Sequence, residues 1–173
     1  MYYDTIQISN RAKANEDNKT RTTSYTIPAS VKKQALSIVG NSTGLDAAKK
    51  IAKWCGTKKN LRYENYANFR RGPTGCLNKH KSNCCDSTRL MLTMMEAAGC
   101  STALKLQYVH VHNSTLNIGH VFAKITTRAT GKYRYVDPVL KIENGRNPWG
   151  NHLKGYGPIV AVQDYNGPNN SPF

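Results

Sequence analysis

The segment from Asn83 to Gly99 constrains the fold more than any other part of the sequence, because it predicts a single apolar helix that begins with a cysteine. Ser82 or Asn83 can cap its first turn, where the carboxylate of Asp86 complements the helix dipole. Apolar side chains then recur at helical spacing, at Leu90, Met91, Met94, Met95 and Ala98. Since glycine commonly ends a helix, we predict a core helix from about Cys84 to Ala98.

Helices and one loop are also predicted before this segment. Apolar spacing favours a helix over residues 30–39, capped by Ser30, and a second helix over 43–54. A third, short helix is expected over 61–69. Residues 70–83 contain Gly, Pro and mostly polar side chains, so we expect a loop there.

The pattern after Gly99 changes to that of strands. Alternating and β-branched residues predict strands over 103–112, 118–126, 133–136 and 158–164. A Gly- and Asn-rich loop is expected over 141–157, and a loose end after Asp164. Helices first and strands later indicate an α+β fold, with the cysteine helix packed on an antiparallel sheet.

The length of 173 residues suits one domain with its own core. We therefore expect a single domain over 1–173, with a mainly helical half at 28–99 and a mainly β half at 100–165. Residues 1–27 are polar and rich in Asn, Lys and Thr, and we predict no definite structure for them. No apolar run is long enough to span a membrane, and no signal peptide is visible, so we expect synthesis in a cytoplasm and no membrane insertion.

Three residues that support nucleophilic chemistry follow one another along the predicted helix and strands: Cys84, His120 and Asp137. A helix N-terminus and a nearby imidazole both favour the thiolate form of a cysteine. We expect His120 to take the thiol proton and to return it to a leaving amine, while Asp137 orients the ring. The Cys84 backbone N–H is a candidate oxyanion donor, and the sequence identifies no second donor.

Cys84 and Cys85 compete for the role of nucleophile. In helical phase, Cys84 shares a face with Thr88 and the apolar residues, whereas Cys85 shares one with Arg89 and Glu96. The more apolar face should pack against the sheet, where we expect the histidine and the aspartate. Helical phase therefore favours Cys84, and Cys85 stays the alternative.

The formal charge of +15 favours a polyanionic partner, either nucleic acid, an acidic wall polymer or a membrane surface. No RNA-binding signature, phosphate-binding loop or helix-turn-helix pattern is present, so we expect no specific nucleic acid. The cysteine count is five, which is odd, and two of the cysteines are adjacent. A full disulfide framework is therefore not expected, and a reducing setting is favoured.

A metal site is the second interpretation of the cysteine segment. Cys76, His80, Cys84 and Cys85 supply four soft ligands at a spacing short enough for structural zinc. The spacing matches no standard zinc knuckle, and the last two ligands would diverge on a helix, so we expect no metal. His110 and His112 could also form a metal pair, although a solvated strand end fits them better. We expect no required cofactor; calcium binding near Asp164 has no supporting loop motif.

The segment Cys84-Cys85-Asp86 with its terminal glycine resembles the cysteine motif of the transglutaminase-like superfamily, in which an acidic residue stands two places after the nucleophile. Gly119-His120-Val121-Phe122 and Tyr135-Val136-Asp137-Pro138 are similar to its histidine and aspartate motifs. The resemblance implies a transglutaminase-like, papain-like cysteine peptidase core, and it selects Cys84 as the nucleophile.

Within this superfamily the chain looks most like the catalytic domain of pseudomurein endoisopeptidases, which are lytic enzymes of viruses of methanogenic archaea. The resemblance implies hydrolysis of the Ala–ε-Lys isopeptide bond in wall cross-links, by a single catalytic domain acting as a monomer. The N-terminal wall-binding repeats usual in that family are not visible here. Two alternatives stay open: a transamidase that uses an amine acceptor, and a non-catalytic module that binds zinc or a polyanion.

Overall fold

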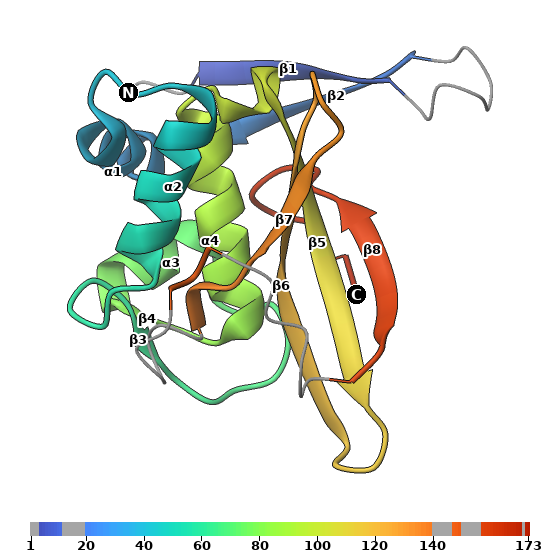
Figure 1. Ribbon diagram of the computed structural model, residues 1–173. Helices are drawn as coiled ribbons and strands as arrows, with labels where there is room; N and C mark the ends of the chain where they lie inside the picture. Colours follow the sequence, from blue (N-terminus) through green and yellow to red (C-terminus); the bar gives the residue numbers. More distant parts are fainter. Residues whose placement is uncertain (1–3, 12–19, 140–146, 150–156, 171) are drawn as a thin grey trace.

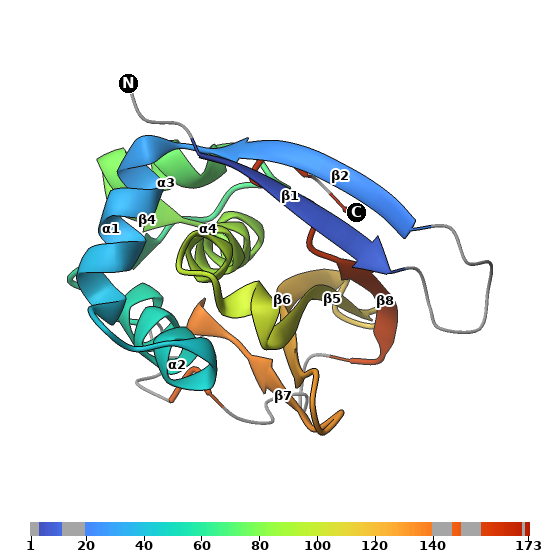
Figure 2. The same ribbon diagram turned by 90° about the horizontal axis from the view of Figure 1, so that it is seen from above.

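Helix α4 (Cys84–Ala97) lies at the centre of the molecule in the computed structural model, between the other helices and a sheet (Figure 2). The structure describes residues 4–11, 20–139, 147–149, 157–170 and 172–173. The predicted core helix is thereby confirmed, and Asn83 is its cap. Every residue of α4 from Asp86 to Ala97 is buried, so the helix has no solvated face. Its apolar side chains each gain about 1.5–3 kcal/mol from burial.

Helices α1 (Ala29–Val39), α2 (Gly44–Cys55) and α3 (Gly72–Lys79) pack around α4 (Figure 1). The predictions for the first two helices are confirmed, except that Pro28 rather than Ser30 occupies the N-cap position of α1. Proline suits a helix start because its fixed φ is already helical.

The predictions for residues 61–83 were wrong. The expected third helix is instead strand β3 (Arg62–Tyr63), which pairs in parallel with β4 (Lys81–Ser82). The expected loop contains α3, which begins at Gly72 and carries Pro73 in its first turn. Pro73 and Cys76 are buried, so packing against the core stabilises a helix whose composition resembles a loop.

The antiparallel sheet has the order β7-β6-β5-β8, and its strands are Leu104–Asn113 (β5), Ile118–Thr127 (β6), Tyr133–Val136 (β7) and Ile159–Asp164 (β8). A short 3-10 turn, Cys100–Thr102, links α4 to β5. The four predicted strands and the α+β class are confirmed. Most of the loop predicted over 141–157 lies outside the described residues.

The polar N-terminal segment forms an antiparallel hairpin of β1 (Asp4–Arg11) and β2 (Thr20–Ile27), which runs along one end of the molecule (Figure 1). At its end the Tyr25 ring packs edge-on to Tyr165, with centroids 5.9 Å apart. The Tyr165 hydroxyl donates to Thr93 of α4 at 3.0 Å. The segment after β8 is therefore packed on the core, and the prediction of a loose end was wrong.

Two clusters of buried apolar residues lie on opposite faces of the sheet. The main cluster joins the helices to the inner face of β5 and β6 through Tyr108, Val121 and Ala123. The smaller cluster on the outer face contains Val109, Val111 and Phe122, with Tyr135 packed against it. Trp54 and the methionines of α4 belong to the main cluster, as the sequence predicts. Among the helices that the structure describes, none has the length and hydropathy needed to cross a bilayer.

Candidate active site

The Asn83 side chain caps the start of α4 and binds the loop that contains Tyr66 and Asn68. Its Oδ1 atom accepts from the Asp86 N–H at 2.8 Å, which is a side-chain cap of the helix. Its Nδ2 atom donates to the carbonyl oxygens of Tyr66 and Asn68, both at 2.8 Å. Cys84 is the first residue of the helix that this cap begins. Its backbone N–H lies in the first turn, where no helical carbonyl accepts it.

The backbone of Val121 attaches the first turns of α4 to strand β6. The Thr88 hydroxyl donates to the Val121 carbonyl at 3.2 Å, and the Val121 N–H donates to the Cys84 sulfur. Val121 pairs with His110 of β5, and its neighbour His120 pairs with Val111. The site therefore lies where β6 extends beyond the end of β7, which pairs with β6 only from Ala123 onward.

His120 and Asp137 form a buried pair beside this thiol. The Nε2 atom of His120 lies 2.6 Å from Oδ2 of Asp137, and the two residues are 7% and 1% exposed. The other carboxylate oxygen accepts from the Val139 N–H at 3.0 Å, and the Asp137 N–H donates to Pro148 at 2.9 Å. Because Nε2 is engaged by the carboxylate, Nδ1 is the ring atom available for the hydrogen bond between His120 and Cys84.

The charges of Cys84 and His120 follow from the hydrogen bonds that these two side chains make. The thiol of Cys85, with sulfur 4.0 Å from that of Cys84, lowers the pKa of Cys84; burial opposes this, and hydrogen bonding to His120 adds to it. Burial lowers the pKa of His120, but hydrogen bonds to Asp137 and Cys84 outweigh it and raise the pKa to about 10. At neutral pH the site therefore holds a thiolate beside an imidazolium.

The pKa of Cys85 is shifted in the opposite direction to that of Cys84. Its hydrogen bond to Cys84, together with burial, raises the pKa of its thiol above the ordinary range. The opposite directions of the two pKa shifts favour Cys85 as the donor in the contact between the two sulfur atoms. In the structure Cys84 contacts His120, the direction that helical phase predicts. The expectation that His120 lies on the sheet face that packs against α4 was wrong. His120 alternates along β6 with Val121 and Ala123, which face α4, so the contact forms at the strand edge and not on the inner face.

Asp86 connects the start of α4 to the loop that precedes α3. Its Oδ2 atom accepts from the Tyr66 hydroxyl at 2.7 Å and from the backbone N–H groups of Arg70 and Arg71 at 3.1 and 2.8 Å. Its Oδ1 atom accepts from Arg89 at 2.7 Å. The carboxylate is fully buried, so these bonds are made away from water. The sequence predicts only its effect on the helix dipole, because its partners lie up to 20 residues away.

The four residues of the zinc interpretation are not brought together. Cys76 is buried in α3, and His80 is exposed with its Nδ1 atom 3.1 Å from the Asn60 carbonyl oxygen. Within the described part of the chain, no group of three or more His, Cys, Asp or Glu side chains could hold a metal ion. His110 is half-buried, and its ring packs on Phe173 with centroids 5.0 Å apart.

An α+β core of helices on an antiparallel sheet, with a cysteine at the start of the central helix, is consistent with the fold of papain-like cysteine peptidases. The sequence model of the transglutaminase-like superfamily matches residues 32–138, which is more than half of the chain. The chain therefore belongs to the transglutaminase-like superfamily. The matched range includes Cys84, His120 and Asp137. Membership supports a cysteine peptidase-type enzyme.

The chain is similar to solved structures at low sequence identity. Calcium-bound LapG of Legionella pneumophila is 11% identical over 83% of this chain and 90% of LapG, with a TM-score of 0.50. A candidate cysteine protease from Cytophaga hutchinsonii is 15% identical over 79% of this chain and 48% of that one, with a TM-score of 0.49. No curated protein sequence matches the chain.

Proposed function

We propose that this chain is a cysteine endoisopeptidase that hydrolyses the bond between an alanine carbonyl and a lysine ε-amino group in the pseudomurein of methanogen cell walls. The observation that carries the proposal is the contact of Cys84 with His120, whose Nε2 atom lies 2.6 Å from Oδ2 of Asp137. The resemblance of the three motifs to those of the endoisopeptidase family supports pseudomurein as the substrate. The charge of +15 suits a wall polymer that carries carboxylates.

The reaction proceeds in two steps. The Cys84 thiolate attacks the alanine carbonyl carbon, and the backbone N–H of Cys84 donates to the oxyanion that forms. The C–N bond breaks as the lysine ε-nitrogen takes the proton from Nδ1 of His120, which leaves an acyl-thioester on Cys84. His120 then removes a proton from water, the hydroxide attacks the thioester, and Cys84 leaves as the thiolate. Asp137 holds the ring orientation throughout.

Transamidation differs only in the second step, in which an amine takes the acyl group from the thioester. Both reactions use the same three residues in the same roles. We propose hydrolysis because the resemblance is to endoisopeptidases. Product analysis separates the two reactions: with hydroxylamine present, a transamidase yields an acyl hydroxamate, whereas a hydrolase yields mainly the free carboxylate.

The decisive experiment combines thiol labelling with activity on a peptide that contains Nε-alanyl-lysine. One equivalent of iodoacetamide at neutral pH should modify Cys84 alone, because burial raises the pKa values of Cys55, Cys76 and Cys100. Cys84→Ala should abolish both labelling and lysine release with folding retained. Lysine release by Cys84→Ala would refute the proposal. Cys100→Ala, a buried cysteine in the turn after α4, is the matched control and should stay active.

We propose no cofactor for the chemical step, because residues of this chain supply the nucleophile and move each proton. LapG was solved with calcium bound, so the assay should be run with and without a calcium chelator. We further propose that the chain acts as a monomer on the cell wall, with neither nucleic acid binding nor membrane insertion in its function. Salt-dependent DNA binding without any thiol reactivity would favour the polyanion-binding alternative.

A further inference from the structure

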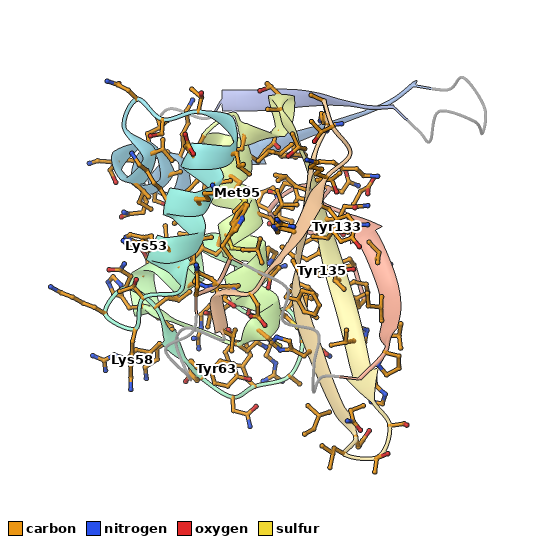
Figure 3. The ribbon with its side chains drawn as sticks, viewed as in Figure 1. Lys53, Lys58, Tyr63, Met95, Tyr133 and Tyr135 are labelled. Carbon is orange, nitrogen blue, oxygen red and sulfur yellow. The ribbon has the colours of Figure 1, made fainter. Side chains whose placement is uncertain are left out.

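A row of aromatic rings connects the molecular surface to the candidate active site along the outer face of the sheet. The ring centroids of Tyr133 and Tyr135 are 5.4 Å apart, and those of Tyr135 and Phe122 are 5.6 Å apart. Phe122 lies 5.9 Å from the ring of His120. Tyr133 and Tyr135 are two residues apart on one strand, so they share a face, and Figure 3 shows them one above the other along β7.

The outer end of this row is exposed and lies in a hollow. Tyr133 is 47% exposed, whereas Phe122 and His120 at the other end are buried. A hollow of about 400 Å³ is lined by residues 130–135, which comprise β7 as far as Tyr135 and the turn before it. We call this hollow the β7 groove. An exposed aromatic side chain beside a hollow is a recognition feature.

The groove is positively charged. Lys132 and Arg134 line it, and the Lys124 ammonium lies 4.5 Å from the centre of the Tyr133 ring. On the other side of β7, a separate hollow of about 230 Å³ is lined by Lys49 together with Lys132 and Arg134. None of the described residues that line either hollow is acidic. The cations therefore have no local carboxylate partner among the lining residues, and they can pair with a ligand that supplies one.

Aromatic rings and cations together select a particular ligand chemistry. The apolar C–H face of a pyranose ring packs on a tyrosine ring, which offers contact area at a small cost in side-chain entropy. Carboxylates on the same sugar accept hydrogen bonds from lysine and arginine. A neutral glycan would use only the rings, and an acidic peptide would use only the cations.

We propose that the β7 groove binds an anionic polysaccharide, a sugar polymer with uronic-acid carboxylates, and thereby holds wall glycan beside the peptide cross-link that is cut. This inference rests on the proposed function, because it assumes that the cut peptides are attached to such a polymer. Strand β7 leads directly to Asp137, so a chain bound along β7 lies next to the site. The groove is a binding site for the polymer and takes no part in bond cleavage.

The test measures binding in the full chain carrying Cys84→Ala, so that turnover does not interfere. The probe is an oligogalacturonate of about ten sugars, titrated by calorimetry at low and high salt. We expect Tyr133→Ala to weaken binding about tenfold and Lys132→Ala to weaken it less, with a reduced salt dependence. Lys58→Ala is the matched control, because Lys58 is an exposed lysine that lies across the helices from β7 (Figure 3). It should bind as the parent does.

Three results would contradict the proposal that the β7 groove binds an anionic polysaccharide. The first is equal weakening by Lys132→Ala and Lys58→Ala with no effect of Tyr133→Ala, since that indicates diffuse charge. The second is equal binding of a neutral dextran of similar length. The third is tighter binding of a single-stranded DNA decamer through the same residues, which indicates a nucleic acid surface. Labelling of Cys84 in the otherwise unchanged chain tests the proposed function separately, so the two failures are distinguishable.

Discussion

The Nε2 atom of His120 lies 2.6 Å from Oδ2 of Asp137, and both side chains are buried. This contact assigns the two ring nitrogens: Nε2 faces the carboxylate, and Nδ1 is available to Cys84. Because Asp137 also accepts from the Val139 N–H, the carboxylate is fixed from two directions. Ring orientation at this site is therefore set before any substrate arrives.

Asp137→Asn should reduce hydrolysis about 10²–10⁴-fold while the fold is retained. The amide keeps the shape of the carboxylate but removes the charge that stabilises the imidazolium. The hydrogen bond to Asp137 raises the pKa of His120 against the effect of burial, so its loss should lower that pKa. Steady-state kinetics and the ring proton shifts of His120 in NMR titrations would measure both effects. An unchanged pKa of His120 would contradict this account.

The reactivity of Cys84 should be nearly independent of pH across the neutral range. Its pKa is lowered by the Cys85 hydrogen bond and, against burial, by His120, so the thiolate persists below the pH at which a free thiol, with pKa of about 8.5, is protonated. The rate of iodoacetamide labelling should change little from about pH 6 to 8, whereas that of free cysteine rises nearly tenfold per unit. Parallel profiles for the two thiols would refute a thiolate at this site.

Hydrolysis should also fall at alkaline pH. The pKa of His120 is raised to about 10, so the proton that the leaving amine needs is present below that pH and is lost as the pH rises through it. The profile of kcat/KM should therefore decline near pH 10 while thiol labelling, which needs no acid, does not. A decline of both measurements together would indicate unfolding and would require a stability control by circular dichroism.

Cys85→Ala should move the acidic limb of the labelling profile to higher pH and leave hydrolysis at neutral pH largely intact. The variant removes the thiol that donates to Cys84 from 4.0 Å, but it leaves the His120 and Val121 hydrogen bonds in place. The measurement is the midpoint of the labelling profile, compared between variant and parent. An inactive Cys85→Ala alongside an active Cys84→Ala would instead identify Cys85 as the nucleophile.

Asp86→Asn should destabilise the fold by about 3–5 kcal/mol, because it leaves the buried guanidinium of Arg89 without its carboxylate partner. Urea unfolding followed by circular dichroism would measure the loss. Asp46→Asn is the matched control, since Asp46 is also the third residue of its helix but is exposed. That variant should cost less than about 1 kcal/mol, through the helix dipole alone. Equal losses in the two variants would contradict the role of the Asp86 network.

The sequence predicts the parts of this molecule whose structure follows from local periodicity. Helix α4 and the strands of the sheet appear within about a residue of their predicted bounds, because their apolar residues recur at the period of each element. The hairpin β1–β2 escaped prediction, since its polar composition lacks that period. Helix α3 and strand β3 escaped because long-range packing and hydrogen bonds, such as those to Asp86, stabilise them.

The geometry of the candidate site was predictable to a similar extent. Chain order and helical phase predict that Cys84, His120 and Asp137 form a group. In the structure His120 contacts both of the other two residues. The contribution of Cys85 was not predicted, because helical phase separates the two cysteines by direction although their sulfur atoms are 4.0 Å apart. The partners of Asp86 depend on a loop whose path no local pattern indicates.

The two backbone groups of Val121 hold the first turns of α4, one through Thr88 and one through the sulfur of Cys84. Alignment of the nucleophile with its base therefore depends on a peptide unit as well as on the side chains of Asn83, Thr88 and Asp137. Many amino acids of suitable volume can stand in place of Val121 without disturbing that alignment. Proline is the exception, since it has no amide hydrogen to offer the sulfur.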